Sequence, residues 1–123
     1  MERGGVTLAK QNAGRDRARK DSSRLQEEEL YRRTADLFGV LSDPTRVKII
    51  HALSRKEMCV GELAGLAGVS DSAVSHQLRI LRNLGLVSYR REGKKAMYTL
   101  SDEHLERILE QSLAHVREKG EKR

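Results

Sequence analysis

The sequence predicts a small, mainly α-helical protein with one β-hairpin, and three patterns support this fold class. Apolar residues recur at helical spacing over most of the chain, Gly68 marks a break between two helical stretches, and Gly93 divides two strand-like runs. At 123 residues the chain fits one small domain, whose size limits its core. We therefore expect much of the apolar surface to be buried between two copies of the chain, in a homodimer.

The N-terminal region divides into an arm and a first helix. Residues 1–22 mix glycine, serine and charges without periodicity, which predicts a mobile basic arm. From residue 23 onward, apolar residues recur at helical spacing and predict an amphipathic helix. These apolar residues are Leu30, Leu37, Phe38 and Leu41. We expect the folded domain over residues 23–119, followed by a short tail over 120–123.

The middle of the chain has the pattern of a helix-turn-helix. Asp43 can cap a second helix, and Pro44 fits its first turn, where a missing N–H costs nothing. This helix is expected to end near Ser54. A short helix over 60–67 and a longer helix over 71–84 then flank a break of three residues.

The longer helix has one face for the core and one for an outside partner. We interpret Asp71 as its cap, because a carboxylate suits a helix start and is a poor group to face phosphate. The apolar stripe consists of Val74, Leu78, Leu81 and Leu84. The other face, at spacings of three and four, carries Ser72, Ser75, His76 and Arg79. The second face is therefore available to an external partner.

A β-hairpin follows this helix. The run "LVSYRREGKKAMYTL" contains two short strand-like segments around "REGK", where Gly93 suits a tight turn. The cationic residues at its tip are Arg90, Arg91, Lys94 and Lys95. A hairpin with a cationic tip, beside an outward-facing helix, is the wing of a winged helix-turn-helix, and this is the architecture that we predict.

The charge of the chain favours a polyanionic partner. Lysine and arginine outnumber aspartate and glutamate by 24 to 18, which gives a net charge of +6. Charge alone is equally consistent with a solvated basic surface. The four aromatic residues are too few for a platform that stacks single-stranded bases, so double-stranded DNA is the expected partner.

The single cysteine and the hydropathy pattern indicate the compartment. Cys59 has no partner for an internal disulfide, which suits a reducing cytosol. We find neither an apolar signal core near the N-terminus nor a segment long enough to span a bilayer. We therefore expect a soluble, cytoplasmic protein with no membrane partner.

Four potential metal ligands lie near the C-terminus, in the stretch "DEHLERILEQSLAHVRE": Asp102, His104, His115 and Glu118. A helix rises about 1.5 Å per residue, so His104 and His115 point in nearly the same direction but stand roughly 16 Å apart. One ion cannot touch both. Asp102 and His104 would have to meet His115 and Glu118 of a second, antiparallel chain.

The donor set of this predicted intersubunit site suits zinc. Two imidazoles and two carboxylates form a four-coordinate shell, for which cobalt or nickel can compete. Any one of these residues is more often structural or a solvated charge, whereas their joint spacing favours a site. An adjacent apolar face would border the site as a dimer contact. That face consists of Leu105, Ile108, Leu109, Leu113 and Val116.

Together these motifs resemble the ArsR/SmtB family of metal-responsive winged-helix repressors. The resemblance rests on "LSDPTRVKIIHAL", "CVGELA", "VSHQLRILRNLGLVSYRREGKKAMYTL" and the final helix, from about Leu30 to Glu118. The Asp-x-His and His-x-x-Glu pairs look like the zinc-sensing branch. The resemblance implies a homodimer that represses a metal-homeostasis promoter and releases its operator when metal binds.

The resemblance also implies residue roles. The stretch that matches the family's DNA-contacting residues contains Ser72, Ser75, His76 and Gln77, with Arg79 and Arg82 better placed for backbone phosphates. By the same resemblance the final helix packs near "RNLGLV". We therefore expect metal-bound His115 to donate its other ring N–H to a backbone carbonyl in this link, that of Gly85.

Cys59 and His51 are interpreted as structural residues. The family can use a cysteine at the position of Cys59 in a second, thiolate-rich site, but residues 1–50 contain no cysteine or histidine to complete it. A free cysteine is more commonly a small buried residue. His51 has no ligand at suitable spacing. We expect neither residue to bind metal.

Two other functions compete with the metal-responsive repressor. A constitutive winged-helix DNA-binding regulator would carry the same four residues as decoration of a dimer interface. A zinc enzyme is disfavoured, because four protein ligands close the shell that catalysis needs open. The sequence also lacks H-E-x-x-H, a nucleophile elbow and a phosphate-binding glycine loop.

Overall fold

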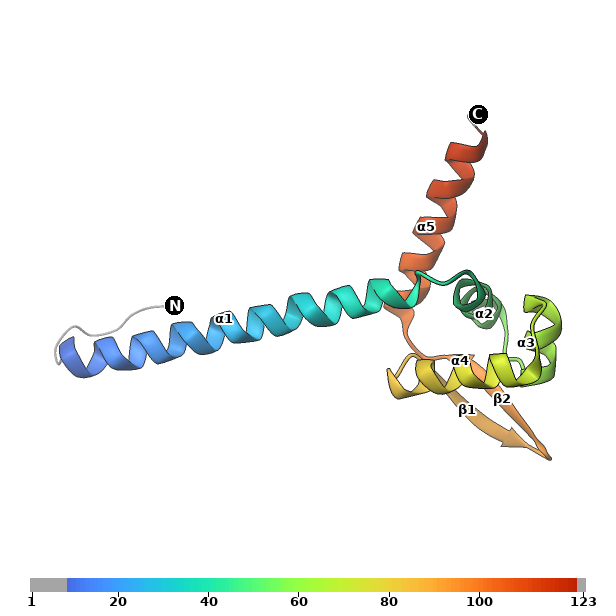
Figure 1. The fold of residues 1–123 in the computed structure, drawn as a ribbon, viewed down its shortest axis with the longest axis horizontal. Helices are drawn as coiled ribbons and strands as arrows, with labels where there is room; N and C mark the ends of the chain where they lie inside the picture. Colours follow the sequence, from blue (N-terminus) through green and yellow to red (C-terminus); the bar gives the residue numbers. More distant parts are fainter. Residues whose placement is uncertain (1–8, 122–123) are drawn as a thin grey trace. The chain divides into compact units, whose positions relative to one another are not determined.

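The structure is a computed structural model that describes residues 9–121, with the side chains of residue 17 and of residues 19–121. Seven elements follow one another along the chain (Figure 1): α1 (Ala9–Val40), α2 (Pro44–Arg55), α3 (Val60–Ala67), α4 (Asp71–Asn83), β1 (Val87–Glu92), β2 (Lys95–Leu100) and α5 (Glu103–Glu121). The chain divides into two compact units, Met1–Gly39 and Val40–Arg123.

The first unit consists of helix α1, which begins earlier than the sequence analysis predicts. The helix already runs from Ala9, so residues 9–22 are helical. This stretch is rich in alanine, arginine and lysine, which favour helix without an apolar stripe. Residues 1–8 of the predicted arm lie outside the described residues.

The exposed side chains of α1 include several large apolar residues. Leu25, Leu30, Tyr31 and Phe38 have exposed fractions between 58% and 70%. Ion pairs at helical spacing add local support, as between Arg33 and Glu29, whose Nε and Oε2 atoms lie 3.0 Å apart. Among the described helices, none combines the length and the apolar character needed to cross a membrane.

The second unit has its core between α2, α3, α4, the hairpin and the start of α5. Helix α2 begins as predicted: the Asp43 carboxylate accepts a hydrogen bond from the Arg46 N–H at 3.0 Å, and Pro44 is the first helical residue. The largest fully buried side chains are Ile49, Ile50, Leu63, Val74, Leu78, Leu81 and Leu105. They come from α2, α3, α4 and α5, so each of these four helices contributes to one core.

The helix-turn-helix of α3 and α4 is confirmed, with two corrections at the ends of α4. Gly68 ends α3 in the left-handed conformation, with φ of +73°. The cap of α4 is Ser70, whose hydroxyl accepts from the Ala73 N–H at 3.1 Å, and Asp71 is the first helical residue. Leu84 is half exposed because α4 ends at Asn83, before the apolar stripe reaches it.

The wing is the predicted hairpin, and it is joined to the helices by a third extended segment. β1 and β2 are antiparallel, with Val87 opposite Leu100 and Glu92 opposite Lys95, and Gly93 makes the turn with φ of +64°. Met58 pairs with Tyr98 through two backbone hydrogen bonds of 3.1 and 2.8 Å. The connection between α2 and α3 therefore extends the base of the wing.

Helix α5 packs on the core at its start and projects at its end. Asp102 caps it, because one carboxylate oxygen accepts from the N–H groups of His104 and Leu105 at 2.9 and 3.0 Å. Leu105 and Leu109 are buried, whereas Val116 is 65% exposed. Figure 1 shows the C-terminal part of α5 extending beyond the rest of its unit. The helix continues through Glu121, into the predicted tail.

Candidate DNA interface and metal site

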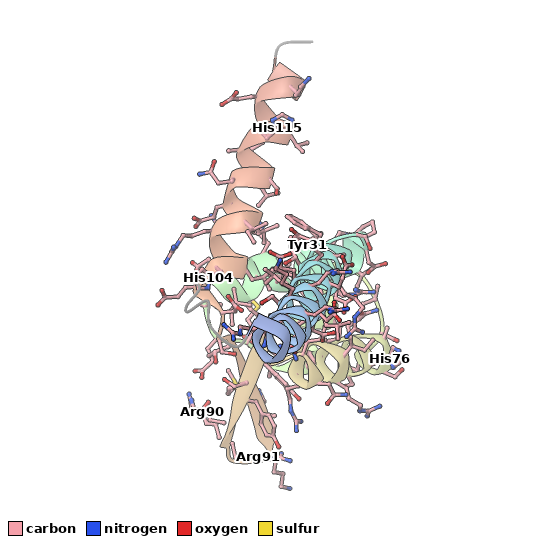
Figure 2. The ribbon with its side chains drawn as sticks, turned by 90° about the vertical axis from the view of Figure 1, so that its left-hand side faces the viewer. Tyr31, His76, Arg90, Arg91, His104 and His115 are labelled. Atoms are coloured by element: carbon pink, nitrogen blue, oxygen red, sulfur yellow. The ribbon has the colours of Figure 1, made fainter. Side chains whose placement is uncertain are left out.

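The outward face of α4 presents the predicted polar residues. Val74, Leu78 and Leu81 are buried, which fixes the helix on the core and turns its opposite face outward. Ser72, His76 and Arg79 are exposed and Ser75 is half-buried. Figure 2 shows His76 directed away from the core. Hydroxyl, imidazole and guanidinium groups on one exposed helix face can hydrogen-bond base edges and phosphates.

Gln77 lies on the flank of α4 that faces α2. Its Oε1 atom accepts a hydrogen bond from Arg46 Nε at 2.9 Å, and both side chains are half-buried. Arg46 also donates to the Val40 carbonyl at 3.4 Å. Gln77 is thus separated from the exposed serine and histidine face and takes part in a contact between two helices.

Arg82 connects the end of α4 to the wing. Its guanidinium carbon lies 4.7 Å from the centroid of the Tyr89 ring, which in turn packs against Tyr98 with 5.3 Å between centroids. Arg91 approaches the same Tyr89 ring at 5.9 Å. The guanidinium groups of Arg82 and Arg91 therefore both lie over one aromatic ring, where the end of α4 meets the hairpin.

The four cations of the wing differ in their surroundings. Arg90 forms two hydrogen bonds to the Glu57 carboxylate, of 2.8 and 2.7 Å, and these bonds lower the pKa of Glu57 below its usual range. Arg91, Lys94 and Lys95 are exposed, and the described residues form no ion pair with them. Figure 2 shows Arg90 and Arg91 at the hairpin.

The first pair of predicted metal ligands lies at the start of α5. His104 Nδ1 is 3.7 Å from the Asp102 oxygen that caps the helix. The His104 side chain is 83% exposed, and that of Asp102 is 31% exposed. A carboxylate and an imidazole are therefore already adjacent at the surface, where both can reach an ion.

The second pair lies about three helical turns further along α5. His115 and Glu118 are both exposed. Within the part of one chain that the structure describes, no three histidine, cysteine, aspartate or glutamate side chains come together as a metal-binding group. One chain thus offers two separate pairs of donors. Two nitrogen and two oxygen donors fit zinc, if a second chain brings the complementary pair.

Gly85 lies in the link between α4 and β1, with φ of +75°. Its N–H donates to the Arg82 carbonyl at 2.9 Å, and the next residue, Leu86, accepts from the Ser101 N–H at 2.9 Å. The link is therefore beside the start of α5, near Asp102. His115 of the same chain is some 20 Å further along the helix and cannot reach Gly85.

Cys59 is buried, as predicted, and precedes α3. Its N–H donates to the Glu62 carboxylate at 3.1 Å, and this bond lowers the pKa of Glu62. His51 is a half-buried residue of α2. The roles of Arg46, Glu57 and Tyr89 as contact partners were not predicted from the sequence, because each meets its counterpart only where separate elements pack.

The sequence matches the family model described as bacterial regulatory protein, arsR family, over residues 43–89, from the cap of α2 into β1. A transcriptional repressor SmtB homologue from Synechocystis sp. is 46% identical over 84 residues, 68% of this chain and 64% of that protein. A cadmium resistance transcriptional regulatory protein CadC homologue from Staphylococcus aureus is 41% identical over 104 residues, 84% of this chain and 83% of that protein.

A solved structure shares the fold. The homodimeric winged helix-turn-helix DNA-binding domain of Mb0332 from Mycobacterium bovis is 26% identical and superposes with a TM-score of 0.71, over 80% of this chain and 91% of that one. Because the relatives are transcriptional regulators, the prediction of a regulator instead of a zinc enzyme is confirmed. The chain has a winged helix-turn-helix and belongs to the arsR family of bacterial regulatory proteins, with relatives among the SmtB-type and CadC-type regulators.

Proposed function

We propose that the protein is a metal-responsive transcriptional repressor that binds an operator as a homodimer and releases it when zinc binds between the C-terminal helices. The observation that carries this proposal is the placement of two pairs of donors at different positions along α5. His104 lies beside Asp102, and the exposed His115 and Glu118 lie about three turns away. Such a helix can complete a four-donor shell only with a second copy, and an antiparallel pairing completes two.

The chain's own residues would hold the ion as follows. Asp102 and His104 of one copy would bind it together with His115 and Glu118 of the other, and zinc would supply a fixed link between the two helices. Each imidazole must be neutral to ligate, so binding weakens as the histidines become protonated. The similarity to a cadmium resistance regulator supports a divalent metal, and the nitrogen and oxygen donors favour zinc, with cobalt or nickel as competitors.

The DNA interface would be the outward face of α4, the proposed recognition helix, together with the wing. Ser72, Ser75 and His76 would meet base edges in the major groove, and Arg79 would contact phosphates. Gln77 would hydrogen-bond the DNA at the edge of this face through its side-chain amide N–H groups, because its Oε1 atom accepts from Arg46. Arg82, with Arg91, Lys94 and Lys95 of the wing, would contact the DNA backbone. This assignment rests on exposure for most of these residues and on the family resemblance for Gln77.

The metal signal would reach α4 through the link around Gly85. Asp102 lies close to this link in its own chain, since Leu86 accepts from Ser101. In the antiparallel pairing, His115 of the second copy arrives beside Asp102 and could donate its other ring N–H to the Gly85 carbonyl. Metal binding would then favour a dimer in which the two recognition helices no longer match successive major grooves.

The test is a titration of a fluorescent operator complex with zinc, followed by a chelator. We expect zinc to release the DNA and the chelator to restore binding. His104→Ala and His115→Ala should each abolish release while the metal-free proteins still bind DNA, and Cys59→Ser should change little. Equal operator affinity with zinc and with chelator would leave a constitutive regulator, and loss of the response only in Cys59→Ser would overturn the ligand assignment.

A further inference from the structure

Arg90 and Arg91 are neighbours in β1 but lie on opposite faces of the wing. Side chains alternate between the two faces of a strand. Arg91 shares its face with Tyr89, whose ring is covered by Arg82 of α4, so this is the face toward the recognition helix. Arg90 therefore belongs to the face that turns away from α4.

The face that carries Arg90 also carries Glu57. Met58 pairs with Tyr98 of β2, and Arg90 lies opposite Met97, so Glu57 is separated from Arg90 by one strand. The Arg90 side chain reaches across β2 and engages both carboxylate oxygens of Glu57, at 2.8 and 2.7 Å. These residues are 33 positions apart in the sequence. The ion pair joins the outer strand of the hairpin to the connection between α2 and α3.

We propose that Arg90 is a positioning residue of the wing, held by Glu57, and that Arg91 provides the phosphate contact of this arginine pair. The inference rests on the proposed DNA-binding function of the wing. An isolated two-stranded hairpin is only marginally stable, so its angle to α4 depends on what joins it to the core. The ion pair of Glu57 and Arg90 supplies such a junction on the outer face of the wing, which turns away from α4. The contact of Arg82 with Tyr89 supplies one on the inner face, toward α4.

The geometry gives a reason for Arg90 to remain on Glu57 when DNA is bound. A guanidinium that engages both oxygens of one carboxylate is held in one direction, and moving it to a phosphate would leave Glu57 unpaired close to a polyanion. Arg91 has no ion-pair partner among the described residues and only stacks on the Tyr89 ring. Its donors can therefore meet a phosphate without breaking a charge pair.

Replacing Glu57 tests the proposal, because a loss of repulsion and a loss of the junction change operator affinity in opposite directions. Removing a carboxylate near a DNA-binding surface ordinarily raises affinity, because one repulsion is lost. We expect Glu57→Gln to lower operator affinity several-fold, because the wing loses its outer junction. The matched control is Glu92→Gln: its carboxylate lies 3.5 Å from the same Arg90 but within the same strand, so its removal should not lower affinity.

The salt dependence of binding separates a junction from a phosphate contact. The duplex would be selected from a random pool with the wild-type protein, and binding followed by fluorescence anisotropy from low to high salt. Each lost phosphate contact reduces the slope of log K against log salt by about 0.9, so Arg91→Gln should reduce it by about 1.8 per dimer. Arg90→Gln should weaken binding at every salt concentration with an unchanged slope.

A charge swap completes the experiment. Glu57→Arg combined with Arg90→Glu restores the pair with reversed polarity, and we expect it to recover most of the affinity lost in Arg90→Gln. Thermal unfolding of each variant shows whether the domain is intact. A reduced slope in Arg90→Gln, higher affinity in Glu57→Gln, or a swap that binds worse than Arg90→Gln would overturn the inference. A wild-type protein that binds no duplex would overturn the proposed function instead.

Discussion

At the scale of single residues, several polar side chains stabilise the start of a helix through one or two hydrogen bonds. Asp43 and Ser70 each satisfy an N–H group at a helix start, and Glu62 accepts the Cys59 N–H before α3. Cys59 therefore belongs to a helix start, which agrees with its burial and with a structural role.

The pair of Glu57 and Arg90 predicts a pH effect. The hydrogen bonds from Arg90 lower the pKa of Glu57 from its usual 4.5, so the pair contributes to stability above that value, and the contribution is lost as pH falls through the lowered pKa. We expect the Glu57 carboxyl carbon, followed by NMR, to titrate below 4.5, and Arg90→Gln to return it toward 4.5. An unshifted titration in the wild type would contradict the ion pair.

The cap of α4 predicts a stability effect that distinguishes Ser70 from Asp71. Ser70→Ala leaves the Ala73 N–H without its acceptor and should cost about 1 kcal/mol of unfolding free energy, whereas Ser70→Asp should restore most of it. Chemical denaturation of the metal-free protein measures both. If Asp71→Ala cost more than Ser70→Ala, Asp71 would be the cap after all.

At the scale of elements, α5 has two parts with different tasks. Its first turns bury Leu105 and Leu109 against the other helices, while Val116 is exposed on the projecting part, between His115 and Arg117. A projecting helix with an apolar residue beside candidate ligands suits contact with a second copy. The proposed metal donors would thus lie both at the packed start of α5 and on the part that we propose to contact a second copy.

The two parts of α5 predict that a substitution at its packed start affects folding, whereas one at its projecting end affects dimer formation. Leu109→Ala should lower the unfolding free energy by roughly 2–5 kcal/mol, since it opens a cavity in the core. Val116→Asp should leave the fold of one chain intact and shift dimer to monomer in analytical ultracentrifugation. A Val116→Asp protein that stays dimeric and still releases DNA with zinc would exclude this part of α5 from the interface.

At the scale of the whole molecule, the proposed homodimer would couple two kinds of site. The proposed metal ligands of α5 and the proposed DNA face of α4 belong to the same unit, and the Leu86 carbonyl accepts a hydrogen bond from Ser101, which joins the link after α4 to the start of α5. Coupling between two binding sites is a free energy and acts equally in both directions. Operator DNA must therefore weaken zinc binding by the factor by which zinc weakens DNA binding.

This reciprocity gives a prediction for the assembled protein. We expect zinc affinity, measured by competition with a chelating dye, to fall by about 10- to 100-fold when the protein is saturated with operator, which corresponds to roughly 1–3 kcal/mol. Replacing His115 by a ring-methylated histidine that still ligates but cannot donate should abolish the coupling and retain zinc binding. Full coupling in the methylated protein would exclude the bond to Gly85.

The sequence alone was sufficient for the features that depend on near neighbours in the chain. Capping and periodicity predicted α2, α3 and α4 with errors of a few residues, and Gly93 predicted the turn of the wing. Helix α1 was predicted too short, because residues 9–22 have helical propensity but no apolar stripe.

Tertiary structure decided which contacts the polar residues make with other segments of their own chain. Residue type and position alone do not indicate that Gln77, Arg82 and Arg90 make contacts between separate elements of the chain. Their contacts with Arg46, Tyr89 and Glu57 arise where separate elements pack, 31 positions apart for Gln77 and 33 for Arg90. Periodicity encodes the direction of a side chain relative to its own helix or strand, whereas its partner depends on which distant segment the core brings beside it.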